Sequence, residues 1–193
     1  MFRNSLLIVC TLALPSTLLG QVSSSTSDGG SVVTDLGYNI RVNDGASLKR
    51  TWVILNDDAA PATLNNVGIA TSYNDRSYTF SARGELGALE ALSAVEIRVL
   101  LFDVFGNHMK TLSSTKVTDL AAGDEIVGEK LGRWRGFENE VSEFLTSVSF
   151  IAHARTMEGR VWRYDSEAIE QRLAEIQLQV TEGELSPSAE NGN

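Results

Sequence analysis

The sequence predicts a mainly β fold, an immunoglobulin-like antiparallel β-sandwich followed by one C-terminal α-helix. Three observations lead to this prediction. Short runs of β-branched and aromatic residues recur along the chain with turn residues between them, two pairs of these runs are joined by glycine-containing turns, and only one stretch has the apolar spacing of a helix. Several short strands without intervening helices are typical of sandwiches and barrels.

Eight segments have the strand pattern, each rich in Val, Ile, Thr or aromatic residues. Turn residues such as Gly, Asn, Asp and Ser separate them. The predicted strands are residues 32–42, 48–55, 67–72, 77–82, 95–105, 108–120, 148–155 and 160–164. Seven or eight strands are enough for the two sheets of an immunoglobulin-like domain.

The most strongly patterned stretch, VEIRVLLFDVFGNHMKTL at residues 95–112, is predicted to be a β-hairpin. Its first half alternates apolar Val95 and Ile97 with polar Glu96 and Arg98, which gives one apolar and one polar face. From Leu100 onward both faces are apolar. That end of the strand is therefore expected to be covered on both sides or twisted by a bulge.

The turn of this hairpin is predicted at Gly106-Asn107, because the first central position of such a two-residue turn requires a positive φ and favours glycine. This turn would place Phe105 opposite His108, Asp103 opposite Lys110 and Leu101 opposite Leu112. Cross-strand pairs of this kind contribute about 0.2–1 kcal/mol each. Folding alone therefore explains Asp103 and Lys110, without any chemistry.

A second hairpin and the only helix are predicted near the C-terminal end. Glu158-Gly159 supplies a turn between residues 150–156 and 160–164. Farther on, Ile169, Leu173, Ile176 and Val180 share one face of a helix, which must pack on the sheet or on the open end of the sandwich. Asp165 stands at the N-cap position, with Glu167 in the first turn to complement the helix dipole.

The phrase AVEIRVLLFDVFGNHMKTLS, residues 94–113, resembles the strand pair of bacterial FxLYD-type domains, in which a strand ends in an aromatic residue, an acid and a glycine turn. The matching positions are Phe102, Asp103 and Gly106. The chain departs from the family pattern where Phe102 replaces a tyrosine and where Val104-Phe105 replaces a more polar pair. The resemblance covers about 60 of the 193 residues. It implies an immunoglobulin-like sandwich on the outer side of a membrane and brings no catalytic residue.

Residues 1–20 have the layout of a secretory signal peptide, with basic Arg3, a short apolar run and small residues after it. The run is too short to cross a bilayer. It contains the only cysteine, Cys10, so the mature chain is expected to lack disulfides and cysteine metal sites. Val9 before this cysteine argues against a lipid anchor. We therefore expect a secreted or periplasmic protein that is stabilised by its hydrophobic core alone.

The charge balance bears on the partners. Removal of the leader removes Arg3, which leaves 15 basic and 25 acidic residues and a formal charge of −10. Nucleic acids and anionic membrane surfaces bind basic faces, so neither is an expected partner. The mature chain has no second apolar run of membrane-spanning length.

One domain is predicted, at residues 32–180. Residues 21–31, QVSSSTSDGGS, are rich in Ser, Thr and Gly and are expected to form a flexible spacer. Residues 181–193, TEGELSPSAENGN, are expected to form a disordered acidic tail. The chain shows no internal repeat between these ends.

Residues suited to catalysis or metal binding are few. His108 and His153 are the only histidines, whereas a zinc site needs three or four ligands. No G-x-S-x-G motif is present. Asp57 and Asp58, within LNDDAAPATLNN, favour a turn in which Asx side chains bond nearby backbone, because the spacing matches no calcium loop. Adjacent carboxylates on a strand also point to opposite faces and do not flank one sugar bond. No catalytic residue, metal or cofactor is predicted.

The candidate partner-binding residues lie in GEKLGRWRGFENEVSEF, residues 128–144, which the sequence predicts to be a loop. They are Arg133, Trp134, Arg135 and Phe137. An exposed aromatic residue between arginines has the composition of a binding hot spot, and tryptophan can stack on a sugar ring. The other interpretation is that Trp134 caps the end of the core, since large aromatics are mostly buried.

The leading hypothesis is therefore an exported, non-enzymatic module that binds a protein partner or stabilises an assembly in the bacterial envelope. The alternative is a carbohydrate-binding module that uses Trp134. A third hypothesis is a hydrolase whose carboxylates the sequence does not identify.

Overall fold

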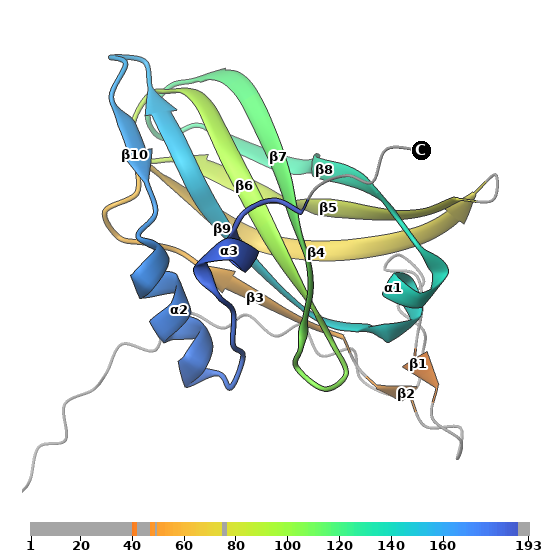
Figure 1. Cartoon of the computed structure of the whole chain (residues 1–193). Helices are drawn as coiled ribbons and strands as arrows, with labels where there is room; N and C mark the ends of the chain where they lie inside the picture. Colours follow the sequence, from red (N-terminus) through yellow and green to blue (C-terminus); the bar gives the residue numbers. More distant parts are fainter. Residues whose placement is uncertain (1–39, 42–46, 49, 75–76, 189–193) are drawn as a thin grey trace, which may run out of the picture.

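The computed structural model describes residues 40–41, 47–48, 50–74 and 77–188 of the chain. Two sheets pack against each other and form a β-sandwich, with short helices near the C-terminal end (Figure 1). This confirms the predicted β-sandwich, but the prediction that all strands are antiparallel was wrong for one pair, because β3 (Thr51–Leu55) runs parallel to β9 (Phe144–Thr156). The predicted leader and spacer lie outside the described residues, as does most of the predicted strand 32–42.

The larger sheet has five strands, in the order β10-β9-β6-β7, with β3 also paired to β9. Its strands are β3 (Thr51–Leu55), β6 (Leu92–Asp103), β7 (His108–Leu120), β9 (Phe144–Thr156) and β10 (Val161–Arg163). β3 runs parallel to the first half of β9, while β10 pairs antiparallel with its last residues. β9 therefore pairs both with a strand from early in the domain sequence, β3, and with its last strand, β10.

The smaller sheet has three antiparallel strands, in the order β4-β5-β8. They are β4 (Ala62–Asn74), β5 (Ser77–Ala88) and β8 (Glu125–Gly136). A separate two-stranded ladder pairs β1 (Ile40–Arg41) with β2 (Ser47–Leu48). The helices are α1 (Glu138–Glu143), α2 (Ser166–Glu175) and α3 (Glu182–Leu185). The prediction of one helix was therefore incomplete, because α1 and α3 are too short to show an apolar repeat.

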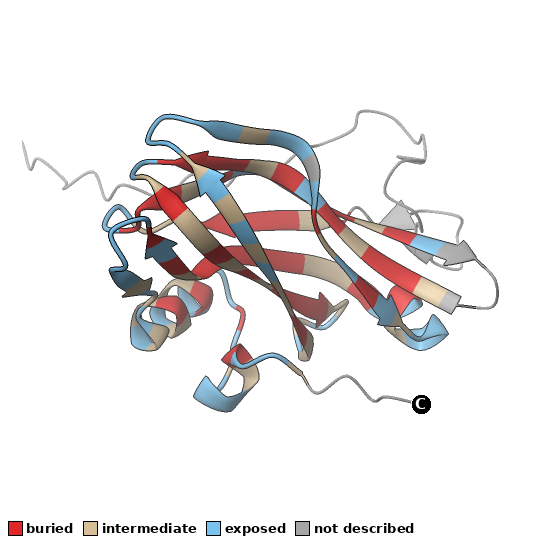
Figure 2. Cartoon of the chain, turned by 90° about the horizontal axis from the view of Figure 1, so that it is seen from above, coloured by how far each residue is buried: buried red, intermediate tan, exposed pale blue. Residues whose placement is uncertain are grey.

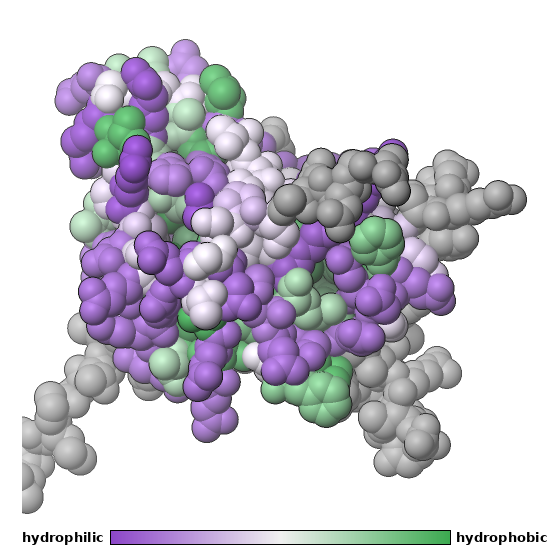
Figure 3. All heavy atoms as spheres, in the orientation of Figure 1, coloured by the Kyte–Doolittle hydropathy of each residue, from purple (hydrophilic) through white to green (hydrophobic). Residues whose placement is uncertain are grey.

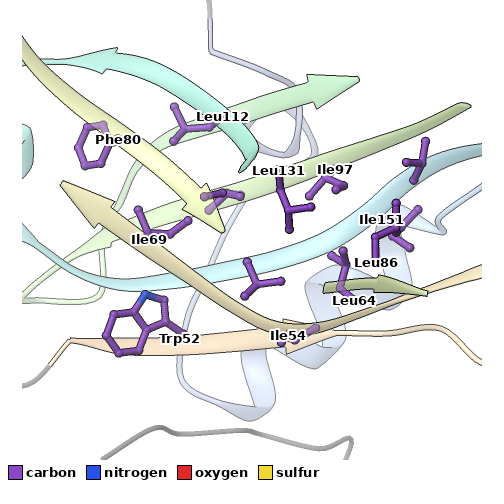
Figure 4. Close-up of a cluster of buried hydrophobic side chains, with 14 of the residues drawn as sticks. Trp52, Ile54, Leu64, Ile69, Phe80, Leu86, Ile97, Leu112, Leu131 and Ile151 are labelled. Carbon is purple, nitrogen blue, oxygen red and sulfur yellow. The ribbon is translucent and has the colours of Figure 1, made fainter. Parts of the chain in front are cut away.

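The main core lies between the two sheets. Figure 4 shows how side chains from both sheets meet there, among them Ile97 and Leu112 from the larger sheet and Phe80 and Leu131 from the smaller. Phe80 and Leu131 are 0% and 1% exposed. Burial of side chains of this size contributes about 1.5–3 kcal/mol each, so this layer stabilises the sandwich.

A second core covers the outer face of the larger sheet. Leu100 and Phe102 of β6 and Val148 and Phe150 of β9 point away from the main core and pack with apolar residues of the C-terminal segment. Helices α2 and α3 lie on this side of the strands in Figure 2, where buried residues extend from the sheet into these helices. For β6 from Leu100 onward the sequence predicted cover on both sides or a bulge. Both faces are covered, and the register also shifts between Leu101 and Phe102.

Helix α2 begins as predicted and ends earlier than predicted. The Asp165 carboxylate accepts a hydrogen bond from the Glu167 backbone N–H at 3.0 Å, which confirms the N-cap. At the other end, Gln177 adopts a φ of +63°, and the Leu178 N–H donates to Leu173 O at 3.0 Å. This is a Schellman motif, which turns Leu178 into the second core and leaves Ile176 36% exposed. The apolar spacing in the sequence extends to Val180, but the helix ends at Glu175.

The described part of the predicted acidic tail, residues 181–188, packs against the larger sheet, and residues 189–193 lie outside the described residues. A hydrogen bond of 2.7 Å from the Thr181 N–H to the Glu184 carboxylate starts α3, and Leu185 is buried in the second core. The Ser188 N–H donates to Thr111 O of β7 at 2.9 Å, and Ser188 Oγ accepts from the Thr111 N–H at 2.9 Å. Residues 181–188 therefore differ from the disordered tail that composition suggested, because one buried leucine and an edge strand hold them.

The turn between β6 and β7 corrects the predicted register. It spans four residues, 104–107, so Leu101 faces Lys110 and Phe102 faces His108. Gly106 has the expected positive φ of +82°. The Asp103 carboxylate accepts the Phe105 and Asn107 N–H groups at 2.8 Å each, so it closes the turn and does not face Lys110. The pKa of Asp103 lies below its ordinary value. Burial acts to raise this pKa, but the hydrogen bonds that the carboxylate accepts, led by the one from the Asn107 side chain, lower it by more.

The second hairpin follows the prediction. Gly159 has a φ of +90°, and the Thr156 N–H donates to Arg160 O at 2.9 Å across the turn. β10 then pairs with β9 through Val161 and Arg155. No helix in the described part of the chain is long and apolar enough to cross a membrane.

Candidate functional site

The segment 128–144 is not a loop: it forms the end of β8, then α1 and the first residue of β9. β8 pairs along its length with β5, and residues around Trp134 alternate between the two faces of the sheet. Gly132, Trp134 and Gly136 point toward the core, while Arg133 and Arg135 point outward. The predicted site residues on β8 therefore divide between its two faces, with Trp134 inward and the two arginines outward.

The inward residues pack aromatic rings. A Cβ at Gly132 would lie 2.3 Å from the Trp134 ring, and one at Gly136 would lie 2.4 Å from the Phe80 ring. Trp134 is 8% exposed, and its Nε1–H donates to Ser113 O of β7 at 2.7 Å. The glycines that suggested a loop are thus strand residues that make room for rings. Trp134 belongs to the core, as the second interpretation of the sequence proposed.

The outward residues form what we call the β8 surface, namely Arg133, Arg135 and Phe137. Arg133 and Arg135 are exposed, and Phe137 is 57% exposed. Phe137 is still extended, with φ −105° and ψ 163°, so the alternation continues through it. Its N–H donates to the Glu140 carboxylate at 2.9 Å, and Glu140 lies 3.4 Å from the Lys110 ammonium. The backbone that carries this exposed ring is therefore held in place.

A polar network that sequence reasoning missed lies on the outer face of the larger sheet. The Glu96 carboxylate lies 2.6 Å from His153 Nδ1, 2.8 Å from Arg98 Nε and 3.0 Å from Ser113 Oγ. Burial opposes ionisation of Glu96, but these hydrogen bonds, led by that from Arg98, outweigh it and lower its pKa. Ser113 bonds the carboxylate and not the imidazole, so the group lacks the nucleophile–base contact of a serine triad.

A β-bulge explains why this network was missed. β9 contains one extra residue between the positions that face Glu96 and Ile97, so Ala152 and His153 share the outer side. With regular alternation along the strand, His153 would lie on the same face as Ile151, which is in the main core. No local signal in the chain marks this bulge.

His108 lies in a different network, under the C-terminal segment. Its side chain is 8% exposed, its Nδ1 lies 3.5 Å from a Glu184 carboxylate oxygen, and its Nε2 lies 2.8 Å from Thr111 Oγ1. The Thr111 hydroxyl donates its hydrogen to Glu184 O, so the Nε2–H of His108 donates to Thr111. Burial lowers the pKa of His108, although the nearby Glu184 carboxylate raises it. The two histidines thus serve separate structural networks.

Arg50 is a buried cation at the start of β3, 8% exposed. It donates to Val141 O at 2.7 Å, to Phe144 O at 3.1 Å and to Thr71 Oγ1 at 3.2 Å, and it lies 4.8 Å above the Phe144 ring. Burial lowers its pKa to about 10, so it stays charged at neutral pH. These contacts tie both sheets to α1.

The acidic stretch after β3 is a turn, as predicted. The Ala59 N–H donates to Asp57 Oδ1 at 2.8 Å, which is an Asx turn. The Asn56 side chain donates to Leu64 O and accepts from the Leu64 N–H, each at 2.9 Å. These polar side chains therefore close the connection from β3 to β4.

Comparisons with known proteins assign no family. No protein-family model matches the sequence, and no curated protein matches it. Among solved structures, the chain is similar to a hypothetical protein from Peptoclostridium difficile 630, with a TM-score of 0.41 and 11% sequence identity. That match covers 67% of this chain and 98% of the other.

Proposed function

We propose that this chain is an exported, non-enzymatic module of the bacterial envelope that binds a protein partner through the β8 surface. The observation that supports this most is the outward row of Arg133, Arg135 and Phe137. It consists of two exposed arginines on one side of β8 and a 57% exposed aromatic ring directly after the end of the strand. Arginine and aromatic residues are the side chains enriched in binding hot spots.

The rigidity of this surface favours binding. β8 is hydrogen-bonded to β5, and the Glu140 carboxylate holds the Phe137 backbone. A preorganised surface loses less conformational entropy on association than a loop does, so more of the contact energy is available for affinity.

The non-enzymatic character of the proposal rests on what the titratable groups do. Glu96 and Asp103 bind neighbouring side chains or backbone within the sheet, and His108 is buried under the C-terminal segment. Each of these groups is explained by the fold it stabilises. The carbohydrate-binding alternative needs an accessible Trp134 ring, and the burial of that ring argues against it.

We further propose that the sandwich is immunoglobulin-like, as the FxLYD resemblance implies. The chain passes between the two sheets in the connections β3 to β4, β5 to β6, β7 to β8 and β8 to β9. Such crossings are typical of Greek-key sandwiches, and these domains often present their binding residues on edges and end loops.

A capture experiment tests the proposed function. The chain without its predicted leader is immobilised and exposed to envelope extract of the producing organism. Retained proteins are compared between wild type, the triple variant Arg133→Glu/Arg135→Glu/Phe137→Ser, and a matched control on β9 and β10, Arg155→Glu/Arg163→Glu/Val161→Ser. The control also removes two exposed arginines and one exposed apolar side chain. We expect one retained protein that the β8 triple variant loses and the control keeps. Equal retention by both variants, or no specific retention by wild type, would contradict the proposal.

A further inference from the structure

The outer face of the smaller sheet carries four exposed cations next to one another. Arg83 of β5 faces Lys130 of β8, and Arg133 and Arg135 continue along β8. Phe80 and Ala82 point into the main core, so Arg83 points outward with its partner Lys130. We call these four residues the basic strip. Ser81 and Thr79 face Arg133 and Arg135, so short side chains stand beside both guanidinium groups.

The basic strip does not serve folding. Like charges directly opposite each other on neighbouring strands are destabilising, and Arg83 and Lys130 are such a pair. None of the four cations makes an ion pair with another described residue. Charged edge strands discourage sheet-to-sheet aggregation, but charges of either sign do so. A run of four cations in a chain with 25 acidic and 16 basic residues therefore indicates an anionic ligand.

We infer that the basic strip binds an extended, acidic segment of a protein partner. This inference rests on the proposed function and names the chemistry of its partner. Outward residues of a strand repeat about every 6.6–6.8 Å, and the carboxylates at alternate positions of an extended peptide have the same repeat. Alternate Asp or Glu residues therefore match Arg133 and Arg135, and each guanidinium binds a carboxylate through two parallel hydrogen bonds.

Phe137 sets the other end of the recognised segment. It follows Arg135 with the same outward spacing and is 57% exposed. An apolar side chain after the acidic residues of the partner would cover this ring and remove apolar surface from water. The ligand is thus a segment with alternate carboxylates followed by an apolar residue. In the other direction the strip ends at Lys130, and the outward positions beyond the bulge include Glu85 and Glu125.

Other polyanions fit this face less well. Sugar rings bind on exposed aromatic platforms, whereas the Trp134 ring lies in the core. An anionic membrane would repel a chain of formal charge −9, and four cations are a small counterweight. A protein segment uses the arginines and the exposed phenylalanine together. Figure 3 shows the opposite side of the molecule, where the C-terminal segment lies and the surface is mostly hydrophilic.

The probe for this inference is a short synthetic peptide in which Glu and Ser alternate and which ends in Leu. Its binding to the wild-type chain is measured by calorimetry at low salt and again at high salt. We expect Arg133→Gln/Arg135→Gln to weaken binding about tenfold, because two bidentate contacts are lost. The matched control Arg155→Gln/Arg163→Gln should change affinity less than about twofold, since these exposed arginines lie on the larger sheet. Binding should weaken with salt, and a peptide with Gln in place of Glu should not bind.

Several outcomes would overturn the inference. They are no binding of the Glu peptide to wild type, equal loss in both double variants, or tighter arginine-dependent binding of a uronate oligosaccharide or of phosphatidylserine vesicles. Thermal unfolding of each variant checks that the fold is intact. If the β8 triple variant loses its envelope partner while the peptide does not bind, the proposed function stands and the acidic segment is wrong. If the peptide binds but wild type retains no envelope protein, the proposed function is wrong and the strip remains an anion site.

Discussion

The outer faces of the two sheets differ in what they carry and in what covers them. On the larger sheet, Leu100, Phe102 and Phe150 are apolar and lie beneath α2 and α3. On the smaller sheet, Arg83 and Arg133 are exposed cations. A sheet that is apolar on both faces needs a third layer, whereas a sheet with one polar face can meet solvent there. The covered face therefore stabilises the domain, and the face with exposed cations is the one that we propose binds a partner.

The largest expected effect comes from truncating a buried side chain of helix α2, which covers the larger sheet. Leu173 of α2 is 0% exposed and packs in the second core, on the outer face of the larger sheet. We expect Leu173→Ala to lower the free energy of unfolding by about 2–5 kcal/mol, because it leaves a cavity. Urea unfolding measures this, with Ile176→Ala as the control on the same helix end, 36% exposed and expected to cost less than about 1 kcal/mol. Equal effects of the two variants would mean that the covering layer does not stabilise the sheet.

The next test concerns the strand that presents the exposed face. In Gly132→Ala, the new methyl group would lie 2.3 Å from the Trp134 ring and 3.0 Å from Ser114 Cβ. We expect a loss of about 1–3 kcal/mol in the free energy of unfolding, since the ring must move within a packed core. Gly183→Ala is the control, because its Cβ would meet nothing nearer than 4.0 Å. If Gly132→Ala unfolds like wild type, Trp134 does not occupy the position described.

A pH test addresses the edge of the covered face. Burial lowers the pKa of His108 below its ordinary value of 6.5, despite the Glu184 carboxylate, so the folded chain binds this proton less readily than the unfolded chain. The free energy of unfolding should therefore fall as pH decreases below about 6.5. His108→Gln should remove this component, as measured by urea unfolding at several pH values. Identical pH slopes for wild type and variant would contradict the buried, neutral imidazole. The carboxylates whose pKa values are lowered, such as Glu184, affect the free energy of unfolding only at more acidic pH, where they become protonated.

The smallest expected effect is a gain on the exposed face. Arg83→Thr removes one of two like charges that face each other across β5 and β8. The free energy of unfolding should rise by about 0.2–0.5 kcal/mol at low salt, and the gain should vanish at high salt. Arg155→Thr, where the cross-strand neighbours are Ala94 and Val161, should give no such gain. A loss of stability in Arg83→Thr would show that Arg83 has a structural role.

Local patterns were sufficient where neighbours along the chain decide the structure. The glycine turn at Glu158-Gly159 and the N-cap at Asp165 involve residues only a few positions apart. The same reasoning failed at β8, where Gly132 and Gly136 have the composition of a loop. Glycine is needed at these two positions because the Trp134 ring lies against Gly132, and the Phe80 ring of another strand lies against Gly136. Of the four candidate residues, Trp134 thus faces the core, whereas Arg133, Arg135 and Phe137 are exposed and stay a predicted binding surface.

The sequence by itself determined that the strand at residues 95–105 has two apolar faces from Leu100 onward, and that a helix begins after Asp165. Alternation and capping are properties of a few consecutive residues. Only the tertiary structure decided that the C-terminal segment covers one sheet, that a bulge brings His153 to Glu96, and that Arg83 joins the arginines of β8. These contacts join residues far apart in the chain, such as His153 and Glu96 at a separation of 57 positions. Packing of whole sheets, and not any local pattern, brings such residues together.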